Sequence, residues 1–325
     1  MKSLKLLSRA FGVMLLGLAA IAPAKAAEDI VVTHYGSLMY GVPYTIALEN
    51  GYFKEVGLDV DGIMTSKGGG TSIRNMLAGD TLYAEVALTS AIAAINEGFD
   101  IKIINGGTDG RSSVWVTRVG EKIETPEDLK GKRFVYSRPK SVSEAMILAV
   151  LESHGYTRDD VTMIAIGDFG AGLTALEHNE VDIAIMPEPI FSKKVKAGAA
   201  YQMISWLDSK LPLYTGTVGV ATSEAIAANE DKIRAVIAAR AKAIAFMDSN
   251  PDETAEIVAK AYNMDVDTAK SAIGNIKKMT PTWWNPGPLQ YDKMDAMAGI
   301  MISTGTLAEM PEWKAFIDDR FLAGN

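Results

Sequence analysis

Small and hydroxyl-bearing residues stand at four positions where the sequence predicts the start of a helix. They are Gly70-Thr71, Thr89-Ser90, Ser141-Val142 and Gly170-Ala171. The first turn of a helix has free backbone N–H groups and the positive end of the helix dipole, so it can bind an anionic or polar group. Plain helix capping is the alternative for any one of them. Two such starts in each half of the chain together indicate a site for a polar solute.

A loop rich in glycine and tyrosine follows the first predicted strand. Tyr35-Gly36-Ser37 and Tyr40 lie between the β-branched run Ile30–Thr33 and a helix that ends at Asn50-Gly51. Glycine lets a backbone approach a ligand, and tyrosine supplies a ring and a hydroxyl group. In open α/β sheets, ligands bind at such strand-to-helix loops. The alternative is an ordinary turn with half-buried tyrosines.

Glu188 stands between two prolines at the end of a predicted strand, Val181–Met186. Its carboxylate could bind an amino or ring N–H group of a ligand; alternatively, it is a solvated acid in a rigid turn. If Glu188 faces the site, a simple anion such as nitrate is disfavoured. The reason is that bringing like charges together out of water is costly.

Aromatic and basic residues are the remaining candidates. Trp284 could stack on a planar ligand or form the rim of a cleft, and packing between C-terminal helices is its alternative. Arg111 and Arg138 could bind a carboxylate or sulfonate through the guanidinium fork, although a surface charge is the commoner role of each. Trp115 is expected in the core of a strand. His34 adjoins the predicted site, where a structural hydrogen-bond donor is its commoner role.

The sequence lacks the motifs of catalysis and of cofactor binding. The glycine run at 67–70 lacks the order of a P-loop, and Gly167, Gly170 and Gly172 have the wrong order for a dinucleotide fingerprint. No G-x-S-x-G or H-E-x-x-H motif occurs, the 3 histidines are scattered, and there is no cysteine for a soft metal site. We therefore predict no catalysis, no cofactor and no metal site.

The order of the predicted elements indicates two α/β lobes. Strands alternate with helical segments of about 10–15 residues, which predicts parallel or mixed sheets with crossover helices. From Ser223 onward the pattern is helical. The extended runs Val114–Thr117 and Gly216–Ala221 are interpreted as crossovers between the lobes; two consecutive independent domains are the alternative. Lobe one would then hold residues 27–117 and 217–325, and lobe two residues 118–216.

The N-terminus has the pattern of a secretory signal. Basic residues precede an apolar stretch from Phe11 to Ala22, and Ala24-Lys25-Ala26 is an A-x-A cleavage site. The apolar stretch is too short for a bilayer span, which needs about 20 residues. We predict that residues 1–26 are a signal peptide, removed after about Ala26; a buried N-terminal helix is the alternative.

Composition restricts the partners and the compartment. The chain has 325 residues and a net charge of −8 at pH 7, and loss of the basic residues within 1–26 would lower that charge to about −12. An acidic surface argues against a nucleic-acid or anionic-membrane partner. Without cysteine, neither a disulfide nor a lipid-modified cysteine anchor can form. An exported protein without an anchor needs an outer membrane to retain it, which favours a Gram-negative periplasm.

Several short motifs occur in an order that resembles one family. The chain reads Ala47-Leu48-Glu49-Asn50-Gly51-Tyr52-Phe53, then Gly57-Leu58-Asp59-Val60, then Lys67-Gly68-Gly69-Gly70-Thr71-Ser72, and later Thr125-Pro126-Glu127-Asp128-Leu129-Lys130-Gly131-Lys132. This order is similar to that of periplasmic solute-binding proteins of nitrate-, taurine- and sulfonate-type ABC importers, with their thiamine-precursor-binding relatives. The resemblance covers most of the mature chain. Fungal pyrimidine-synthesising enzymes of the same fold carry a cysteine-rich motif that this chain lacks, which argues against their chemistry here.

The resemblance implies a two-lobed periplasmic-binding-protein fold of type II, in which each lobe is a mixed sheet flanked by helices. It implies a monomeric, periplasmic, non-catalytic protein that captures a small organic solute by lobe closure and delivers it to an inner-membrane permease and its ATPase. A sulfonate or taurine-like, carboxylate or aromatic solute is expected, and a thiamine-precursor pyrimidine or related heterocycle is the alternative. The predicted ligand-binding residues are Tyr35, Gly36, Ser37, Tyr40, Gly69, Gly70, Thr71, Thr89, Ser90, Ser137, Ser141, Ser143, Glu188 and Trp284.

Overall fold

The computed structural model describes residues 29–79, 81–139 and 141–322. The predicted signal peptide, residues 1–26, lies outside the described residues. Over the described ranges, no helix has both the length and the apolar character that a bilayer crossing requires.

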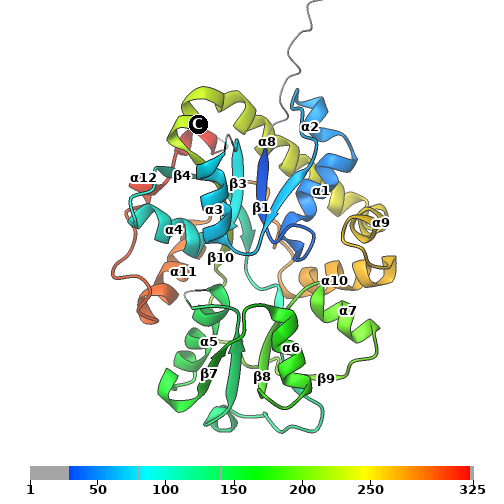
Figure 1. The fold of residues 1–325 in the computed structure, drawn as a ribbon, viewed down its shortest axis with the longest axis vertical. Coiled ribbons are helices and arrows are strands. Elements are labelled where there is room, and N and C mark those ends of the chain that lie inside the picture. Colours follow the sequence, from blue (N-terminus) through cyan, green and yellow to red (C-terminus); the bar gives the residue numbers. More distant parts are fainter. Residues whose placement is uncertain (1–28, 80, 140, 323–325) are drawn as a thin grey trace, which may run out of the picture.

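Lobe one is built on a five-stranded sheet with the order β2-β1-β3-β10-β4 (Figure 1, upper half). Its strands are β1 (Ile30–Thr33), β2 (Ile63–Ser66), β3 (Tyr83–Ala87), β4 (Ile101–Asp109) and β10 (Thr215–Thr222). β1 pairs in parallel with β2 and β3, whereas β10 runs antiparallel to β3 and β4. The sheet is therefore mixed, as expected. Its N-terminal helices are α1 (Val42–Glu49), α2 (Tyr52–Glu55), α3 (Gly69–Ala78) and α4 (Leu88–Asn96), with the 3-10 turn η1 (Met39–Gly41).

Lobe two has its own five-stranded sheet with the order β7-β6-β8-β5-β9 (Figure 1, lower half). Its strands are β5 (Ser113–Arg118), β6 (Arg133–Tyr136), β7 (Thr162–Ala165), β8 (Ile183–Pro187) and β9 (Tyr201–Met203). β6 is parallel to β7 and β8, and β5 is antiparallel to β8 and β9. The helices are α5 (Val142–Ser153), α6 (Phe169–Glu177) and α7 (Ile190–Lys196), with the 3-10 turns η2 (Pro126–Leu129) and η3 (Arg158–Asp160).

The C-terminal third is helical, as the sequence predicts. It comprises α8 (Ser223–Ser249), α9 (Pro251–Ala261), α10 (Val266–Met279), α11 (Tyr291–Ser303) and α12 (Trp313–Phe316), with the 3-10 turn η4 (Asp319–Phe321). α8 and α9 pack against α1 of lobe one. α10 also contacts α7 of lobe two, and α11 contacts α5 of lobe two. Most of these helices pack against elements of lobe one, and two of them also contact lobe two.

The chain crosses between the sheets beside the two runs selected from the sequence. Val114–Thr117 lies within β5 in the second sheet, and Gly216–Ala221 lies within β10 in the first. Both runs were interpreted as crossovers. The chain leaves the first sheet between β4 and β5 and returns to it between β9 and β10, so each of these runs directly follows a crossing. The two crossings are joined, since the N–H of Gly110 donates to the carbonyl of Tyr214 at 2.6 Å.

Helix caps explain several of the observed boundaries. Ser141 caps α5, because its hydroxyl accepts from the N–H of Glu144 at 3.2 Å. α4 begins at Leu88 with Ala87 in the cap position. Thr89 and Ser90 therefore lie inside its first turn, and the expectation that they cap the helix is wrong.

A charged pair lies in the core of lobe one. Glu85 on β3 and Arg240 on α8 are both 0% exposed, and their side chains meet at 3.0 Å. Glu85 also accepts hydrogen bonds from the hydroxyl groups of Tyr44 and Thr217, each at 2.7 Å. Burial alone would lower the pKa of Arg240, but the neighbouring Glu85 carboxylate raises it. Burial, reinforced by the charge of Glu85, raises the pKa of Tyr83 to about 12.

Hydrogen bonds from the same pair continue to the C-terminal segment and towards the first crossing. Arg240 donates to the carbonyl of Asn285 and, at 2.5 Å, to the carbonyl of Gly107. The Asn285 side chain donates to Asp109 at 2.7 Å, and Thr215 donates to the other Asp109 oxygen at 2.8 Å. β3, β10, α8 and the residues before the crossing are thus fixed in one hydrogen-bonded network.

Arg240→Met is expected to destabilise the protein by about 3–5 kcal/mol, because it leaves the Glu85 carboxylate buried without its cation. Urea unfolding followed by circular dichroism measures this. Arg234→Met on the same helix is the matched control, since its partner Glu230 is partly exposed and such a pair contributes about 0–1 kcal/mol. Equal losses in the two variants would contradict the role given to the buried pair.

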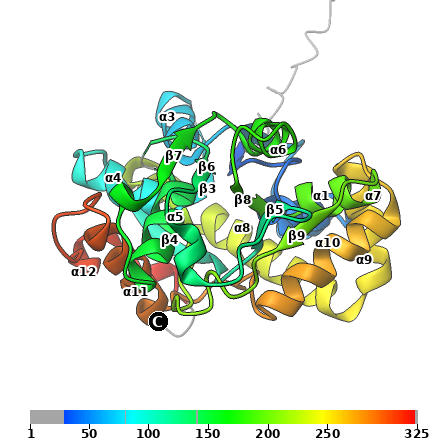
Figure 2. The ribbon, with the colours of Figure 1, turned by 90° about the horizontal axis from the view of Figure 1, so that it is seen from below.

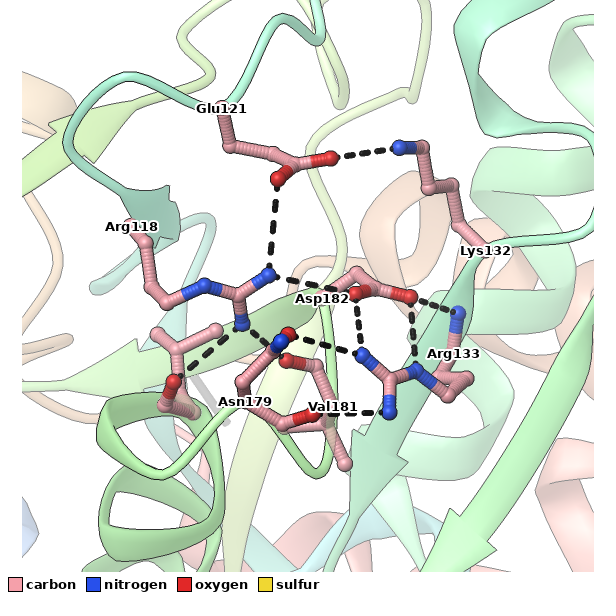
Figure 3. Close-up of polar contacts among 8 residues, drawn as sticks. Arg118, Glu121, Lys132, Arg133, Asn179, Val181 and Asp182 are labelled. Atoms are coloured by element: carbon pink, nitrogen blue, oxygen red, sulfur yellow. Dashed lines mark hydrogen bonds and ion pairs between the residues drawn. The ribbon is translucent and has the colours of Figure 1, made fainter.

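A second charged network joins the end of β5, the start of β6 and the residue before β8 in lobe two (Figure 3). Asp182 accepts from Arg133 at 2.6 Å and from Arg118 at 3.3 Å, and Glu121 bridges Arg118 and Lys132. Burial alone would raise the pKa of Asp182, but the hydrogen bonds from Arg133 and Arg118 lower it to about 2. The ionised carboxylate is therefore the form that stabilises this lobe.

The pKa of Asp182 is about 2 in the folded protein against an ordinary 3.8. Its stabilisation is complete above about pH 4 and is lost as the pH falls towards 2. Asp182→Asn should cost about 1–2 kcal/mol at pH 7, after allowance for partial exposure, and should cost almost nothing near pH 2. Urea midpoints across this pH range measure the difference. Asp159→Asn, at an exposed carboxylate, is the control; a cost of Asp182→Asn that does not change with pH would contradict the prediction.

Candidate solute-binding site

The carboxyl ends of the parallel strands of lobe one bring the predicted first-lobe residues together. The N–H of His34 donates to the carbonyl of Ser66 at 2.9 Å, and the Thr65 hydroxyl donates to the carbonyl of Tyr35 at 3.0 Å. The loop of Tyr35, Gly36 and Ser37 therefore lies beside the end of β2. Ser37 is exposed, and Tyr35 and Gly36 are half-buried.

Beneath this loop lies a buried hydroxyl cluster. The Thr33 and Ser72 hydroxyl oxygens are 2.6 Å apart, and those of Ser66 and Ser72 are 2.5 Å apart. Thr33 also donates to the carbonyl of Glu85 at 3.1 Å. These groups bond one another and fix the start of α3 against β1 and β3. No sequence motif marks them, and only their spatial convergence shows their role.

The starts of α3 and α4 lie side by side. A Cβ added to Gly69 would lie 2.6 Å from the Cβ of Ser90, so the two helix starts touch. Gly70 is exposed, and Thr71 accepts a hydrogen bond from Arg74 at 3.1 Å. Thr89 is buried, while Ser90 is half-buried. The structure thus brings together the two first-lobe helix starts predicted from the sequence.

Three serines form a compact group at the start of α5 in lobe two. The hydroxyl of Ser143 lies 3.0 Å from that of Ser137 and 2.9 Å from that of Ser141. The N–H of Ser137 donates to the Ser143 hydroxyl at 3.0 Å. Ser137 and Ser141 are half-buried, so they can reach a solute, whereas Ser143 is buried behind them.

The residue after β1 and the residue after Ser137 influence each other electrostatically. Burial lowers the pKa of His34 in lobe one, and the positive charge of Arg138 in lobe two lowers it further. An electrostatic effect of this kind requires the two side chains to be close. Arg138 follows Ser137 directly and is exposed.

A small pocket lies where the chain crosses between the lobes. Its residues come from both crossings, from β5 and β8, and from α5; they are Arg111, Ser113, Trp115, Met146, Ile185, Asp208, Leu211 and Tyr214. Its volume is about 10 Å³, which is room for one water molecule. A second pocket adjoins it at Ile185 and extends to Ser137 and the start of α6. Among the described residues, neither the first pocket nor its surroundings has room for an organic molecule in this arrangement of the lobes.

The pocket carries both signs of charge beside an apolar wall. Arg111 and Asp208 approach to 3.6 Å, and the Nε atom of Arg111 is buried without a hydrogen-bond partner. Burial raises the pKa of Asp208, against the opposing effect of Arg111. Burial also raises the pKa of Tyr214, and the nearby Tyr40 adds to that effect. Arg111 was selected from the sequence, but Asp208 and Tyr214 were not, because no motif surrounds them.

A family model described as NMT1/THI5 like matches residues 39–254. The chain belongs to the NMT1/THI5-like family. YtlA of Bacillus subtilis (strain 168), named as a candidate binding protein, is 26% identical over 304 residues, which cover 89% of this chain and 88% of YtlA.

Solved structures share the fold of this NMT1/THI5-like chain. The periplasmic aliphatic sulphonate binding protein SsuA from Escherichia coli has 15% identity and a TM-score of 0.73, with 90% of this chain and 98% of SsuA covered. The periplasmic nitrate-binding protein NrtA from Synechocystis PCC 6803 has 14% identity and a TM-score of 0.59, with 74% of this chain and 68% of NrtA covered. The expected family resemblance and the two-lobed α/β fold are confirmed.

Glu188 has protein partners for both carboxylate oxygens. It is 2% exposed, accepts from the side chain of Asn275 at 2.7 Å and accepts from the N–H of Ser192 at 3.2 Å. This arrangement differs from both alternatives stated for Glu188, because its partner Asn275 comes from a helix distant in the sequence. In this NMT1/THI5-like chain Glu188 joins the lobes.

The aromatic residues of lobe one pack against one another. Trp284 is 4% exposed, and its indole N–H donates to the carbonyl of Met39 at 3.0 Å. The structure therefore agrees with the alternative role stated for Trp284, which is packing. The rings of Tyr40 and Trp283 lie 5.6 Å apart, and burial raises the pKa of Tyr40 to about 12. Tyr40 is half-buried, so part of its side chain stays accessible beside the crossing.

The part of the chain that the structure describes has no cluster of histidine, aspartate or glutamate residues suited to a metal ion. The charged or titratable residues discussed above include His34, Arg138, Arg111 and Asp208, together with Tyr40 and Tyr214. These groups can bind charged and hydrogen-bonding parts of a solute.

Gly69→Ala is expected to destabilise lobe one by about 1–3 kcal/mol, since the added methyl group overlaps Ser90. Gly70→Ala is the matched control, because the nearest atom to its added Cβ is a side-chain nitrogen of Arg74 at 3.7 Å. Thermal and urea unfolding of both variants measure the difference. Equal stability of the two variants would show that α3 and α4 do not meet at Gly69.

Proposed function

We propose that this protein is the solute-binding component of an ABC importer, which captures a small organic solute between its two lobes and releases it chemically unchanged. The observation that carries this proposal is the arrangement of two separate sheets joined by paired crossings. Each lobe also has a helix that starts with small or hydroxyl residues, α3 in lobe one and α5 in lobe two. Membership of the NMT1/THI5-like family and the names of SsuA and NrtA support it.

The proposed partners are the permease and the ATPase of the importer in the inner membrane, and the proposed state is a monomer in the periplasm. Support comes from the signal-peptide pattern at residues 1–26, the absence of cysteine and the periplasmic location in the names of SsuA and NrtA. Our proposal includes no chemical conversion of the solute. YtlA, SsuA and NrtA are all named for binding, which supports this part of the proposal.

The proposed solute carries a sulfonate, a carboxylate or a planar heterocycle as its head group. Hydroxyl groups of Ser137 and Ser141 and the helix starts suit polar oxygen atoms, while the rings of Tyr40 and Trp115 suit an apolar part. The second candidate is a thiamine-precursor pyrimidine or related heterocycle. The close pair of Arg111 and Asp208 favours it, because such a ring presents hydrogen-bond donors and acceptors side by side.

The proposed ligand contacts are the accessible residues at the gap. The proposed mechanism is closure of the two lobes around the solute. A solute that binds both lobes has more contacts in the closed arrangement, so it shifts the protein towards that arrangement. The closed form is what the permease would recognise. The contacts are Tyr35, Gly36, Ser37, Tyr40, Gly70, Thr71, Ser90, Ser137 and Ser141, with Gly69, Thr89 and Ser143 behind them.

A thermal-shift panel tests the function. Taurine, alkanesulfonates, nitrate, aromatic carboxylates and aminopyrimidines are each added to the mature protein. A true solute at 100 times its dissociation constant should add about 2.7 kcal/mol of stability. Ser141→Phe, which places a bulky ring at the start of α5, should abolish the shift and keep the circular dichroism spectrum. Ser249→Phe, at an exposed position at the end of α8, is the control and should keep the shift. A shift with nitrate alone would refute the organic solute, and turnover of a compound would refute the transport role.

A further inference from the structure

The lobes touch on both flanks of the gap, and the two contacts differ in chemistry. Figure 2 shows α11 near α5 on one flank and α7 beside α10 on the other. On the first flank, the buried side chains of Met294 and Met297 from α11 join one apolar cluster with Ala145 and Ile147 from α5. Opening this contact would expose apolar surface to water, which is costly.

The contact between α7 and α10 is mostly polar. The side chain of Asn275 on α10 donates to Glu188 at 2.7 Å and lies 3.5 Å from the Ser192 hydroxyl on α7. Lys193 on α7 donates to the carbonyl of Tyr262 at 2.9 Å. Among the apolar side chains, Met279 packs against the cluster of lobe two. Water can replace polar partners of this kind. This polar contact between α7 and α10, here called the seam, can therefore open at a small cost.

The C-terminal end of α9 and the N-terminal end of α7 take part in the contacts at the seam. Tyr262 is the C-cap residue of α9, and a cation is favoured at the negative end of a helix dipole. Lys193 thus satisfies a terminal carbonyl of a lobe-one helix from lobe two. Glu188 accepts from the N–H of Ser192 in the first turn of α7 while it binds Asn275. Lys196 adds weak pairs with Asp265 and Asp267, each at 3.8 Å.

Each side of the seam is fixed within its own lobe. α7 follows β8 directly, so it moves with the sheet of lobe two. α10 packs on α9, and α9 packs on α1 in lobe one. Relative motion of the lobes about the apolar flank and the crossings must therefore make or break the contacts of Lys193 and Asn275.

We propose that the seam between α7 and α10 is a latch: Lys193 and Asn275 hold the lobes closed, and their contacts form and break as the lobes move about the apolar contact of α11 with α5. The latch rests on the proposed capture of a solute between the lobes, and it regulates that capture. Part of the solute affinity then comes from residues that do not line the pocket. The latch also holds a closed population before any solute binds.

Distances between spin labels in the solute-free protein test the latch. The chain has no cysteine, so Asn75→Cys on α3 and Thr174→Cys on α6 provide the only two labelling sites, one on each lobe. In the labelled protein with Lys193 and Asn275 unchanged, the distances between the two labels should include a population that matches the closed structure. Lys193→Met should lower the ratio of closed to open protein about tenfold, and Lys193→Met with Asn275→Leu about a hundredfold.

Lys194→Met is the matched control. Lys194 lies next to Lys193 on α7, but it pairs with Glu177 inside lobe two at 3.0 Å. This variant should keep the distances of the parent protein, and circular dichroism should show that all variants are folded. Identical distances in the Lys193 and Lys194 variants, or no closed population in the parent, would overturn the latch. Because no solute is used, these results stand apart from the thermal-shift panel, which tests the transport function itself.

Discussion

The buried pair of Glu85 and Arg240 is the interaction on which lobe one depends. Neither charge is exposed, so each needs its partners in full: a carboxylate without its cation, or a guanidinium without its carbonyl acceptors, would cost several kcal/mol. Those partners come from α1, β10, the end of β4 and the segment around Asn285. The pair therefore fixes the relative positions of elements that lie far apart in the sequence. It also fixes Asp109, close to the first crossing.

Because this network is rigid, the chain enters the first crossing from a fixed position. The strands before and after each crossing belong to separate sheets. A hydrogen bond between Gly110 and Tyr214 joins the two crossings. Motion is thereby confined to a short region where Arg111 and Asp208 meet. The apolar contact of α11 with α5 resists separation more strongly than the polar contact of α7 with α10, whose partners water can replace. The proposed binding function needs this asymmetry, because closure must be specific in direction and still reversible.

Most of the proposed solute-binding groups are already hydrogen-bonded within the protein. The serines at the start of α5 bond one another, and the hydroxyl groups of Thr33, Ser66 and Ser72 do the same beneath the first loop. Such internal bonding holds the side chains in place before a solute arrives, which lowers the entropy cost of binding. Accessible groups, such as Ser137, Ser141 and Arg138, then present a preformed polar surface.

Local sequence determined the strands, most helix starts, the two-lobed α/β class and the convergence of glycine and hydroxyl residues at the strand ends. These features follow from periodicity and capping, which act within a few residues. Tertiary structure alone decided the pairing of Glu85 with Arg240 and the use of Glu188 and Trp284 as packing and bridging residues. It also placed Asp208 beside Arg111. Such choices depend on which partner a polar group meets from a distant segment, and no short-range pattern specifies that partner.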